Sequence, residues 1–182
     1  MEFKNTIQAM QKLGGDVVKE GRGILKKEKK ASGTLYNDFD YLVTASQEYV
    51  TLDFEFGKAE DYWAFVDEGV RGAGGYKGRG KMRGGNSPFR FGSGKSKGKW
   101  PQFTSAIQKW IKKKGIKGRD KKGKFITNKS LGFLIQRAIY QRGLTRTQFF
   151  SRPFTQQLKK QTDAIVKAFG EDLEKQIETI IK

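Results

Sequence analysis

The sequence contains no cysteine and no histidine, and these absences exclude whole classes of chemistry. Without cysteine there is no disulfide framework, no thiolate nucleophile and no zinc site of the usual Cys/His kind. Without histidine there is no Ser-His-Asp triad and no acid or base catalyst built on imidazole. The composition therefore favours a binding or structural protein over an enzyme, and we expect no metal and no cofactor.

Long apolar runs are also missing. No segment approaches the roughly 20 apolar residues that a membrane-spanning helix needs, and the N-terminal residues lack the apolar core of a signal peptide. We therefore expect a soluble chain that is made in the cytoplasm and has no membrane contact. The 182 residues include 14 Phe, 6 Tyr and 3 Trp, which is enough aromatic surface to build a core. This length predicts a single domain over residues 1–182.

Acidic residues are scarce in the middle of the chain. Residues 71–124 hold 18 Lys and Arg and one acid, Asp120, whereas the remainder holds 19 basic and 18 acidic residues. From 70 to 99 the chain is also rich in glycine and poor in apolar residues, so this stretch cannot bury enough surface to order itself alone. We expect a long basic loop there, called below the basic arm (residues 70–99).

Apolar spacing predicts long helices at both ends of the chain. Residues 3–29 repeat apolar side chains at intervals of three, four and seven. Gly14 and Gly21 fall on that stripe, so either a neighbouring backbone approaches closely or the helix breaks near Gly14. Ser151 is a good N-cap, with proline in the first turn after it. The helix over 154–182 is expected to keep one face apolar: Phe154, Leu158, Ile165, Phe169, Leu173, Ile177 and Ile180.

A hairpin and two shorter helices are expected between these ends. Residues 34–45 and 47–57 are interpreted as two strands, because apolar and polar residues alternate in both, most clearly in the second. Helices are predicted from Pro101 to Gly115 and from about Asn128 to Gln141. The side chains expected to point inward from the second of these are Leu131, Leu134, Ile135, Ala138 and Ile139. The faces around Trp110, Ile139 and Phe169 are expected to be core.

Together these patterns predict an α+β fold. Its parts are a small antiparallel β-sheet, long N- and C-terminal helices packed on it, and the long Gly/Lys/Arg-rich arm.

Two apparent catalytic signals fail on closer reading. Gly94-Lys95-Ser96 ends like a phosphate-binding P-loop, but the position that needs a glycine five residues earlier is Phe89, and no strand precedes it. Asp67 and Glu68 adjoin an aromatic segment without a partner carboxylate at a recognisable spacing. We expect them to be solvated residues that cap a turn or balance the basic arm. A carboxylate- and metal-dependent nuclease is accordingly disfavoured.

The basic arm is the main candidate for function, and three interpretations stay open. A flexible positive chain with interleaved aromatics can follow a phosphate backbone and stack on bases. It can instead become ordered on a partner protein with acidic neighbours, or it can be a solvated loop. The candidate contact residues are Arg71, Lys77, Arg79, Lys81, Arg83, Arg90, Lys95, Lys97 and Lys99.

Four features in chain order resemble the tail-completion and neck (head–tail joining) proteins of tailed bacteriophages. A helix leads through Gly-Thr-Leu into a hairpin, and an aromatic segment, 62–69, ends in an acid and a glycine. A Trp-Pro helix over 100–115 is followed by Ile135, Ala138-Ile139 and Gly143-Leu144. Finally, Arg-Pro-Phe at 152–154 opens a long closing helix. The resemblance touches most of the chain, although the arm is longer and more basic than the family leads one to expect.

The resemblance implies a structural virion protein without catalytic residues. It implies a homo-oligomeric ring between portal and tail, in contact with other neck, portal or tail proteins and with the channel through which packaged DNA leaves. The expected location is the neck or tail region of the virion, with the host cytoplasm as the place of assembly. The alternative is a basic nucleic-acid-binding protein whose 70–124 segment binds DNA without sequence specificity.

Overall fold

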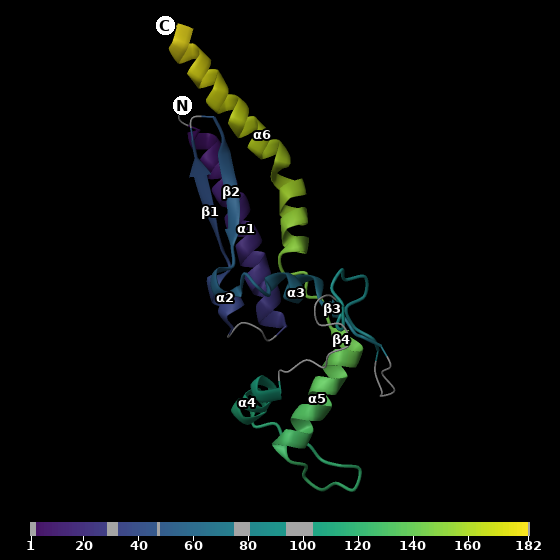
Figure 1. The fold of residues 1–182 in the computed structure, drawn as a ribbon. Coiled ribbons are helices and arrows are strands. Elements are labelled where there is room, and N and C mark those ends of the chain that lie inside the picture. The colour runs from purple at the N-terminus through teal and green to yellow at the C-terminus, as the bar shows by residue number, and fades with distance from the viewer. Residues whose placement is uncertain (1–2, 29–32, 47, 75–80, 94–103, 182) are drawn as a thin grey trace. The chain divides into compact units, whose positions relative to one another are not determined.

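The computed structural model describes residues 3–28, 33–46, 48–74, 81–93 and 104–181 (Figure 1). The chain divides into two compact units, which we call unit 1 (residues 1–67 and 147–182) and unit 2 (residues 68–146). Each unit is described by itself. The single domain expected over 1–182 stays a prediction, because a division into compact units does not show whether either unit folds alone.

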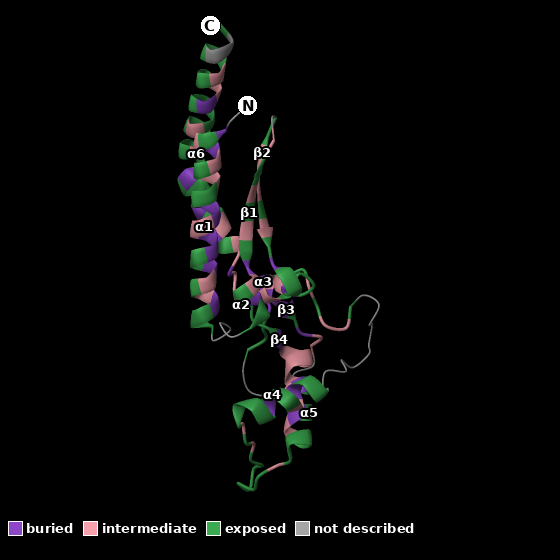
Figure 2. Ribbon diagram, turned by 90° about the vertical axis from the view of Figure 1, so that its left-hand side faces the viewer, coloured by how far each residue is buried: buried purple, intermediate pink, exposed green. Residues whose placement is uncertain are grey.

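Unit 1 is built from two long helices, a two-stranded sheet and short connecting helices. In chain order these are α1 (Lys4–Lys27), α2 (Thr34–Asp38), β1 (Asp40–Ala45), β2 (Val50–Glu55), the 3-10 turn η1 (Gly57–Ala59), α3 (Trp63–Glu68) and α6 (Ser151–Ile181). The strands pair in antiparallel register, with Tyr41 opposite Phe54 and Val43 opposite Leu52. Helix α1 lies beside the sheet and along α6 (Figures 1 and 2). The predicted α+β class with long terminal helices is confirmed.

Helix α1 runs without a break through both glycines of its stripe. At Gly21 an added Cβ would lie 2.6 Å from the Phe149 carbonyl oxygen and 2.6 Å from the Phe39 ring, and at Gly14 it would overlap the Tyr41 ring. Glycine is therefore needed at these two positions, because Phe39, Tyr41 and the Phe149 carbonyl lie directly against the backbone of α1. Of the two expectations, close approach is the one that holds.

The core of unit 1 is dominated by phenylalanine. Phe39 is fully buried; its ring stacks on Phe56 at 5.1 Å and meets Phe149 edge-on at 5.4 Å. Phe56 stacks in turn on Trp63 at 4.2 Å, and Phe150 meets both of these rings edge-on. Offset-stacked and edge-on pairs add about 0.5–1.5 kcal/mol each beyond the burial of their area. This cluster joins the sheet, α3 and the start of α6 into one core.

The first of the two predicted strands is partly wrong, because residues 34–38 form α2 and only Asp40–Ala45 form β1. Leu35 and Phe39 are both buried in the core. Their spacing of four places two side chains on one face of a helix and equally on one face of a strand. The pattern could not distinguish the two, and Gly33, in extended conformation at the N-cap, opens the helical turn.

The contact between α1 and α6 is polar at its centre. Gln161 donates to Asp16 at 3.0 Å and to Gln157 at 2.9 Å, and Gln157 donates to Glu20. At the other end Asp172 accepts from the backbone amide and the hydroxyl of Thr6, both at 2.8 Å, and from the amide of Asn5. Burial alone would raise the pKa of Asp172. The bonds from Thr6 and Asn5, with the charge of Lys175, outweigh that effect and hold the pKa below its usual value.

The apolar row of α6 does not face the core along its whole length. Steps of four residues advance by about 40° around a helix of 3.6 residues per turn, so the row winds around α6 and no single face holds all of it. Ile165 is half-buried, whereas the exposed fraction is 42% for Phe169, 57% for Ile177 and 79% for Ile181. The predicted core face around Phe169 holds only in part, because its ring stacks on buried Phe3 at 5.9 Å but stays exposed on its other side. Polar Gln157, Gln161 and Asp172 occupy the most buried positions of α6.

Unit 2 consists of two packed helices and a small set of paired segments. Helices α4 (Thr104–Lys114) and α5 (Asn128–Arg142) pack together, and β3 (Val70–Arg71) pairs antiparallel with β4 (Gly143–Leu144). Thr127 caps α5 by accepting from the Ser130 amide, and Gly143 follows the last residue of the helix.

The inward face predicted for α5 needs correction. Gly132 and Gln136 are its buried residues, whereas Leu134 is 50% exposed and Ile135, Ala138 and Ile139 are half-buried. Ile107 and Ile111 of α4 are buried, and both come within 3.9 Å of the position that a Cβ would take on Gly132. The close approach of α4 at a glycine explains the shift of the buried face. Trp110, also expected in the core, is 47% exposed.

Candidate assembly and nucleic-acid surfaces

The acidic pair that follows the aromatic segment has a structural role at its first member. Asp67 is 2% exposed, and its Oδ1 accepts from the backbone amides of Phe150 at 2.8 Å and Ser151 at 3.3 Å. It therefore caps α6 from a distant part of the chain. Ser151, predicted to be the N-cap, is instead the first residue of the helix. Within the described ranges no group of three or more His, Cys, Asp or Glu is arranged to hold a metal ion.

The predicted contact residues of the basic arm fall into two groups. Arg71, Lys81, Arg83 and Arg90 are described and belong to unit 2. Their backbone is held in place: the Arg71 amide donates to Phe89, the Arg83 amide donates to the Arg142 carbonyl at 2.8 Å, and the Lys81 carbonyl accepts from Arg142 Nε. Lys77, Arg79, Lys95, Lys97 and Lys99 lie outside the described residues.

The described part of the arm is ordered by the end of α5 rather than by a core of its own. The Ala73 amide donates to the Tyr140 carbonyl at 2.9 Å, and buried Ser87 donates from its hydroxyl to the Gly69 carbonyl at 2.7 Å. Gly84 has a positive φ of 85°, and an added Cβ would lie 2.5 Å from the Val70 backbone. Glycine is thus required here for close backbone packing.

Charge is divided between the two units. Unit 2 holds 22 Lys and Arg against two acids, Glu68 and Asp120, a net charge of +20. The rest of the chain, unit 1, holds 15 basic and 17 acidic residues, a net charge of −2. The net positive charge of the chain therefore comes entirely from unit 2.

The densest cations lie on the second half of α4, the loop after it and the start of α5, on what we call the basic tip (residues 109–129). It holds ten basic residues and one acid, and all ten basic residues are exposed. The DNA-binding alternative drawn from the sequence includes this stretch up to residue 124, but all the contact residues predicted from the sequence lie within 71–99. The basic tip is identified by three observations together: its charge, the exposure of its cations and the hydrogen-bonded backbone of its loop.

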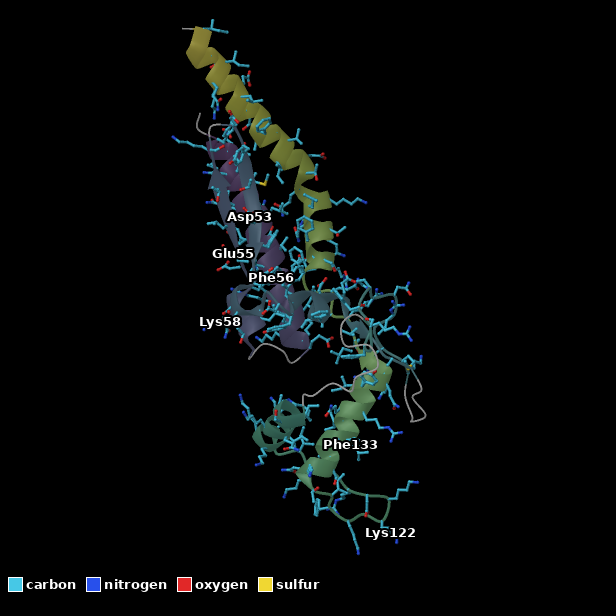
Figure 3. All side chains as sticks on the ribbon, viewed as in Figure 1. Asp53, Glu55, Phe56, Lys58, Lys122 and Phe133 are labelled. Carbon is cyan, nitrogen blue, oxygen red and sulfur yellow. The ribbon has the colours of Figure 1, made fainter. Side chains whose placement is uncertain are left out.

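A second charged surface covers the outer face of the sheet in unit 1. Residues 34–68 contain nine acids and one basic residue, Lys58. Asp40 lies directly opposite Glu55 in the register, and Asp53 shares their exposed face beside Leu42, which is 51% exposed (Figure 3). Like charges directly opposite each other destabilise a sheet, so the pairing of Asp40 with Glu55 lowers the stability of unit 1.

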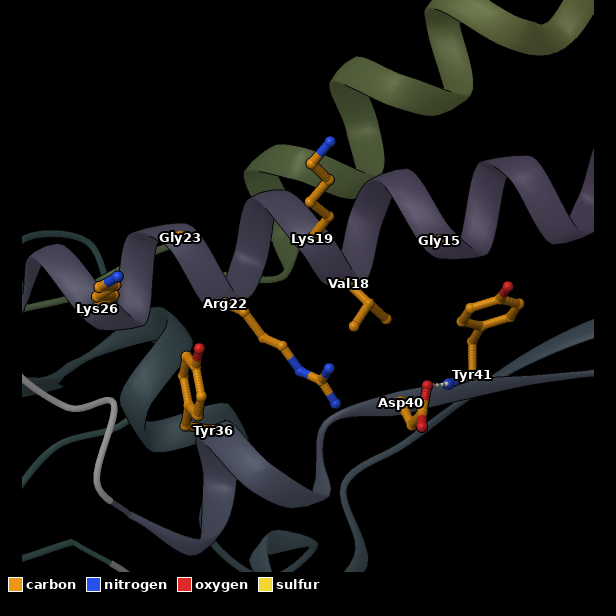
Figure 4. A pocket seen from close by; sticks show the side chains of 9 residues that line it. All are labelled: Gly15, Val18, Lys19, Arg22, Gly23, Lys26, Tyr36, Asp40 and Tyr41. Carbon is orange, nitrogen blue, oxygen red and sulfur yellow. Dashed lines mark hydrogen bonds between the residues drawn. The ribbon is translucent and has the colours of Figure 1, made fainter.

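Two grooves flank α1 in unit 1. One, of about 380 Å³, lies between α1, the end of the hairpin and α6, and its apolar lining includes Met10, Val50, Ile165, Val166 and Phe169. The other, of about 480 Å³, is lined by basic residues of α1, by Tyr36 and Tyr41 and by Asp40 (Figure 4). In it Arg22 reaches across and donates to the Phe39 carbonyl at 2.8 Å, which fastens α1 to the start of β1.

When the chain is compared with protein-family models, with curated proteins and with solved structures, nothing matches. Among the described residues no helix is both long enough and apolar enough to cross a membrane.

Proposed function

We propose that this chain is a non-enzymatic structural subunit of a tailed-phage virion. In this proposal it forms or completes the head–tail neck ring by assembling with copies of itself and with neighbouring portal or tail proteins. The order of sequence features that resembles the neck and tail-completion family supports the proposal. The observation that carries it is that one chain presents an exposed apolar row, an acidic face and a strongly basic unit.

The apolar row of α6 supports assembly because isolated proteins rarely keep such rows exposed. Phe169, Ile177 and Ile181 continue outward from the apolar groove next to Val166, which is 65% exposed. Contiguous exposed apolar surface is typical of a surface that another protein covers.

Charge complementarity makes a second copy the occupant that we favour for the contact with the outer sheet face. Asp53 and Glu55 offer exposed negative charge, and unit 2 of another copy offers a net charge of +20. Such a contact joins two different surfaces, so repeated contacts propagate head to tail and close into a ring where the rotation permits.

A charge-adding variant tests the proposal in solution. Val166→Glu places a carboxylate in the apolar groove, and we expect it to lower the self-association constant at least about tenfold, the equivalent of one lost contact of about 1.4 kcal/mol. Gln156→Glu adds the same charge at an exposed position of α6 and serves as the control. Sedimentation velocity over a range of concentrations reads out both variants. Equal self-association of wild type and both variants, or a monomer at every concentration, contradicts the proposal.

The second candidate function, DNA binding through residues 70–124, is favoured by the net charge of unit 2. It predicts that the isolated monomer binds DNA tightly and that the affinity falls steeply with salt. An assembly subunit is expected to associate with copies of itself whether or not DNA is present, so the two candidates differ in the state of the free chain.

A further inference from the structure

We infer that the basic tip of unit 2, residues 109–129, is a binding site for the phosphate backbone of duplex DNA. The inference goes beyond the proposed assembly role. It concerns unit 2 alone, and it narrows the DNA-binding segment of the second candidate, residues 70–124, to its C-terminal part and away from the basic arm.

The cations of the tip have no counter-ions among the described residues. Its one acid, Asp120, is used by the backbone instead: its Oδ1 accepts from the amides of Lys122 at 2.8 Å and Lys124 at 2.9 Å. No ion pair is found between any tip cation and a described carboxylate. The cations are Lys109, Lys112, Lys113, Lys114, Lys117, Arg119, Lys121, Lys122, Lys124 and Lys129. Ten like charges on one short stretch repel each other, and a polyanion relieves that repulsion.

The backbone that carries these cations is held in a fixed shape. Residues 118–126 form a small hairpin, in which the Asp120 amide donates to Lys124 at 2.8 Å and the Ile126 amide donates to Gly118 at 3.0 Å. Arg119 and Phe125 form an antiparallel bridge. Lys122 lies on this loop, before α5 (Figure 3). Because the loop is already ordered, less conformational entropy is lost when its side chains meet phosphates.

An arginine and an aromatic ring stand together within the tip. The Arg119 guanidinium lies 3.9 Å from the centre of the Phe125 ring and donates to the Gly123 carbonyl at 2.8 Å. Phe125 nevertheless stays 60% exposed. A ring beside fixed cations provides apolar surface next to phosphate-binding charge, a combination that recurs where proteins follow nucleic acids.

The composition of the tip favours DNA over other anionic partners. Nine of its ten cations are lysine, and lysine is depleted at the centres of protein–protein interfaces. A membrane surface would require an apolar helix face to insert next to the charges. In α4, Ile107 and Ile111 are buried within unit 2 and therefore not available for insertion. Lysines on a fixed loop without base-reading groups correspond to binding of the backbone without sequence preference.

The test compares two triple variants of the full chain with equal charge. Lys121→Gln, Lys122→Gln and Lys124→Gln remove three charges from the tip and leave the Asp120 backbone bonds intact. Lys12→Gln, Lys159→Gln and Lys160→Gln remove three exposed charges from unit 1. Binding to a 30-base-pair duplex is titrated between 50 and 200 mM salt, with vesicles of phosphatidylserine and phosphatidylcholine as a second probe. Circular dichroism checks that both variants remain folded.

We expect the tip variant to lose about tenfold or more in duplex affinity at 100 mM salt. The slope of log K against log salt should become shallower by about three, because roughly 0.9 counterions are released per phosphate contact. The unit 1 variant should keep the wild-type slope. Equal losses in both variants, absence of duplex binding by the wild type, or binding to vesicles without binding to DNA would each overturn the inference. Self-association is measured separately, so failure here leaves the assembly proposal untouched.

Discussion

At the scale of single residues, the contact between α1 and its neighbours depends on the absence of a side chain at Gly21. A Cβ there would meet the Phe149 carbonyl and the Phe39 ring at 2.6 Å, and both groups belong to the core of unit 1. Gly23, two residues on in the same helix, has nothing within 4 Å of its Cβ position. A substitution at Gly21 therefore tests close packing, whereas the same substitution at Gly23 tests helix propensity alone.

We predict opposite effects for alanine at these two glycines. Gly21→Ala should destabilise the chain by about 1–3 kcal/mol, because overpacking forces the backbone and rings to shift. Gly23→Ala should stabilise it by up to about 1 kcal/mol, the gain in helix propensity. Urea denaturation measured side by side gives both free energies of unfolding. Stabilisation by both substitutions would show that Gly21 does not lie in a close contact.

Asp172 provides a pH-dependent prediction. Its pKa is lowered in the folded chain, so its ionised form adds stability that is present above the unfolded pKa of about 4 and is lost as the pH falls through the folded pKa. Asp172→Asn should cost about 1–3 kcal/mol at pH 7, the net worth of its hydrogen bonds to a charged acceptor. The difference from wild type should shrink as the pH drops below 4 in thermal unfolding. A difference that is constant from pH 7 to pH 3 would contradict the account.

At the scale of elements, the start of α6 depends on a residue more than 80 positions earlier in the chain. Asp67 accepts from the amides of Phe150 and Ser151, and the Thr147 amide donates to the Val66 and Asp67 carbonyls at 3.1 Å. The bonded residues lie in the two segments, 66–67 and 147–151, at which the chain leaves and re-enters unit 1. The contacts that cap α6 therefore also hold these two segments together.

Removing this cap should destabilise unit 1 measurably. Asp67→Ala leaves two helix-start amides without an acceptor in a buried place, which we expect to cost about 1–3 kcal/mol. Asp67→Asn keeps an oxygen at the same position and should recover much of that loss. The melting temperatures of the two variants, compared with wild type, test the assignment. Equal melting temperatures for Asp67→Ala and wild type would refute a capping role.

Sequence periodicity predicts the existence of each helix well and the orientation of some helices poorly. The predicted range 3–29 corresponds closely to α1, and α5 begins and ends within one residue of the prediction. The apolar row of α6 was a poor guide to the buried face of that helix. Apolar residues spaced by four look amphipathic in a short window, yet they wind around a long helix. Asp67 could not be recognised as a cap because its partners are distant in sequence.

At the scale of the whole molecule, the sequence shows where the basic segment lies but not where the basic unit, unit 2, begins and ends. The excess of cations over 71–124 is visible in the sequence, whereas the assignment of all net positive charge to unit 2 requires the contacts that close that unit at 68–146. The acidic face of the sheet also depends on register, since Asp40, Asp53 and Glu55 gather on one side only when β1 and β2 pair as they do.

The proposed architectural role is a claim about where the chain resides. Under the proposed function a tailed phage encodes the chain, so the most direct measurement is its copy number in purified particles of that phage, by quantitative peptide mass spectrometry against the portal protein. A neck subunit predicts a fixed, low copy number, comparable to that of the portal ring and unchanged after nuclease treatment and a high-salt wash. Absence of the chain from particles, or an amount that varies between preparations, would contradict the account.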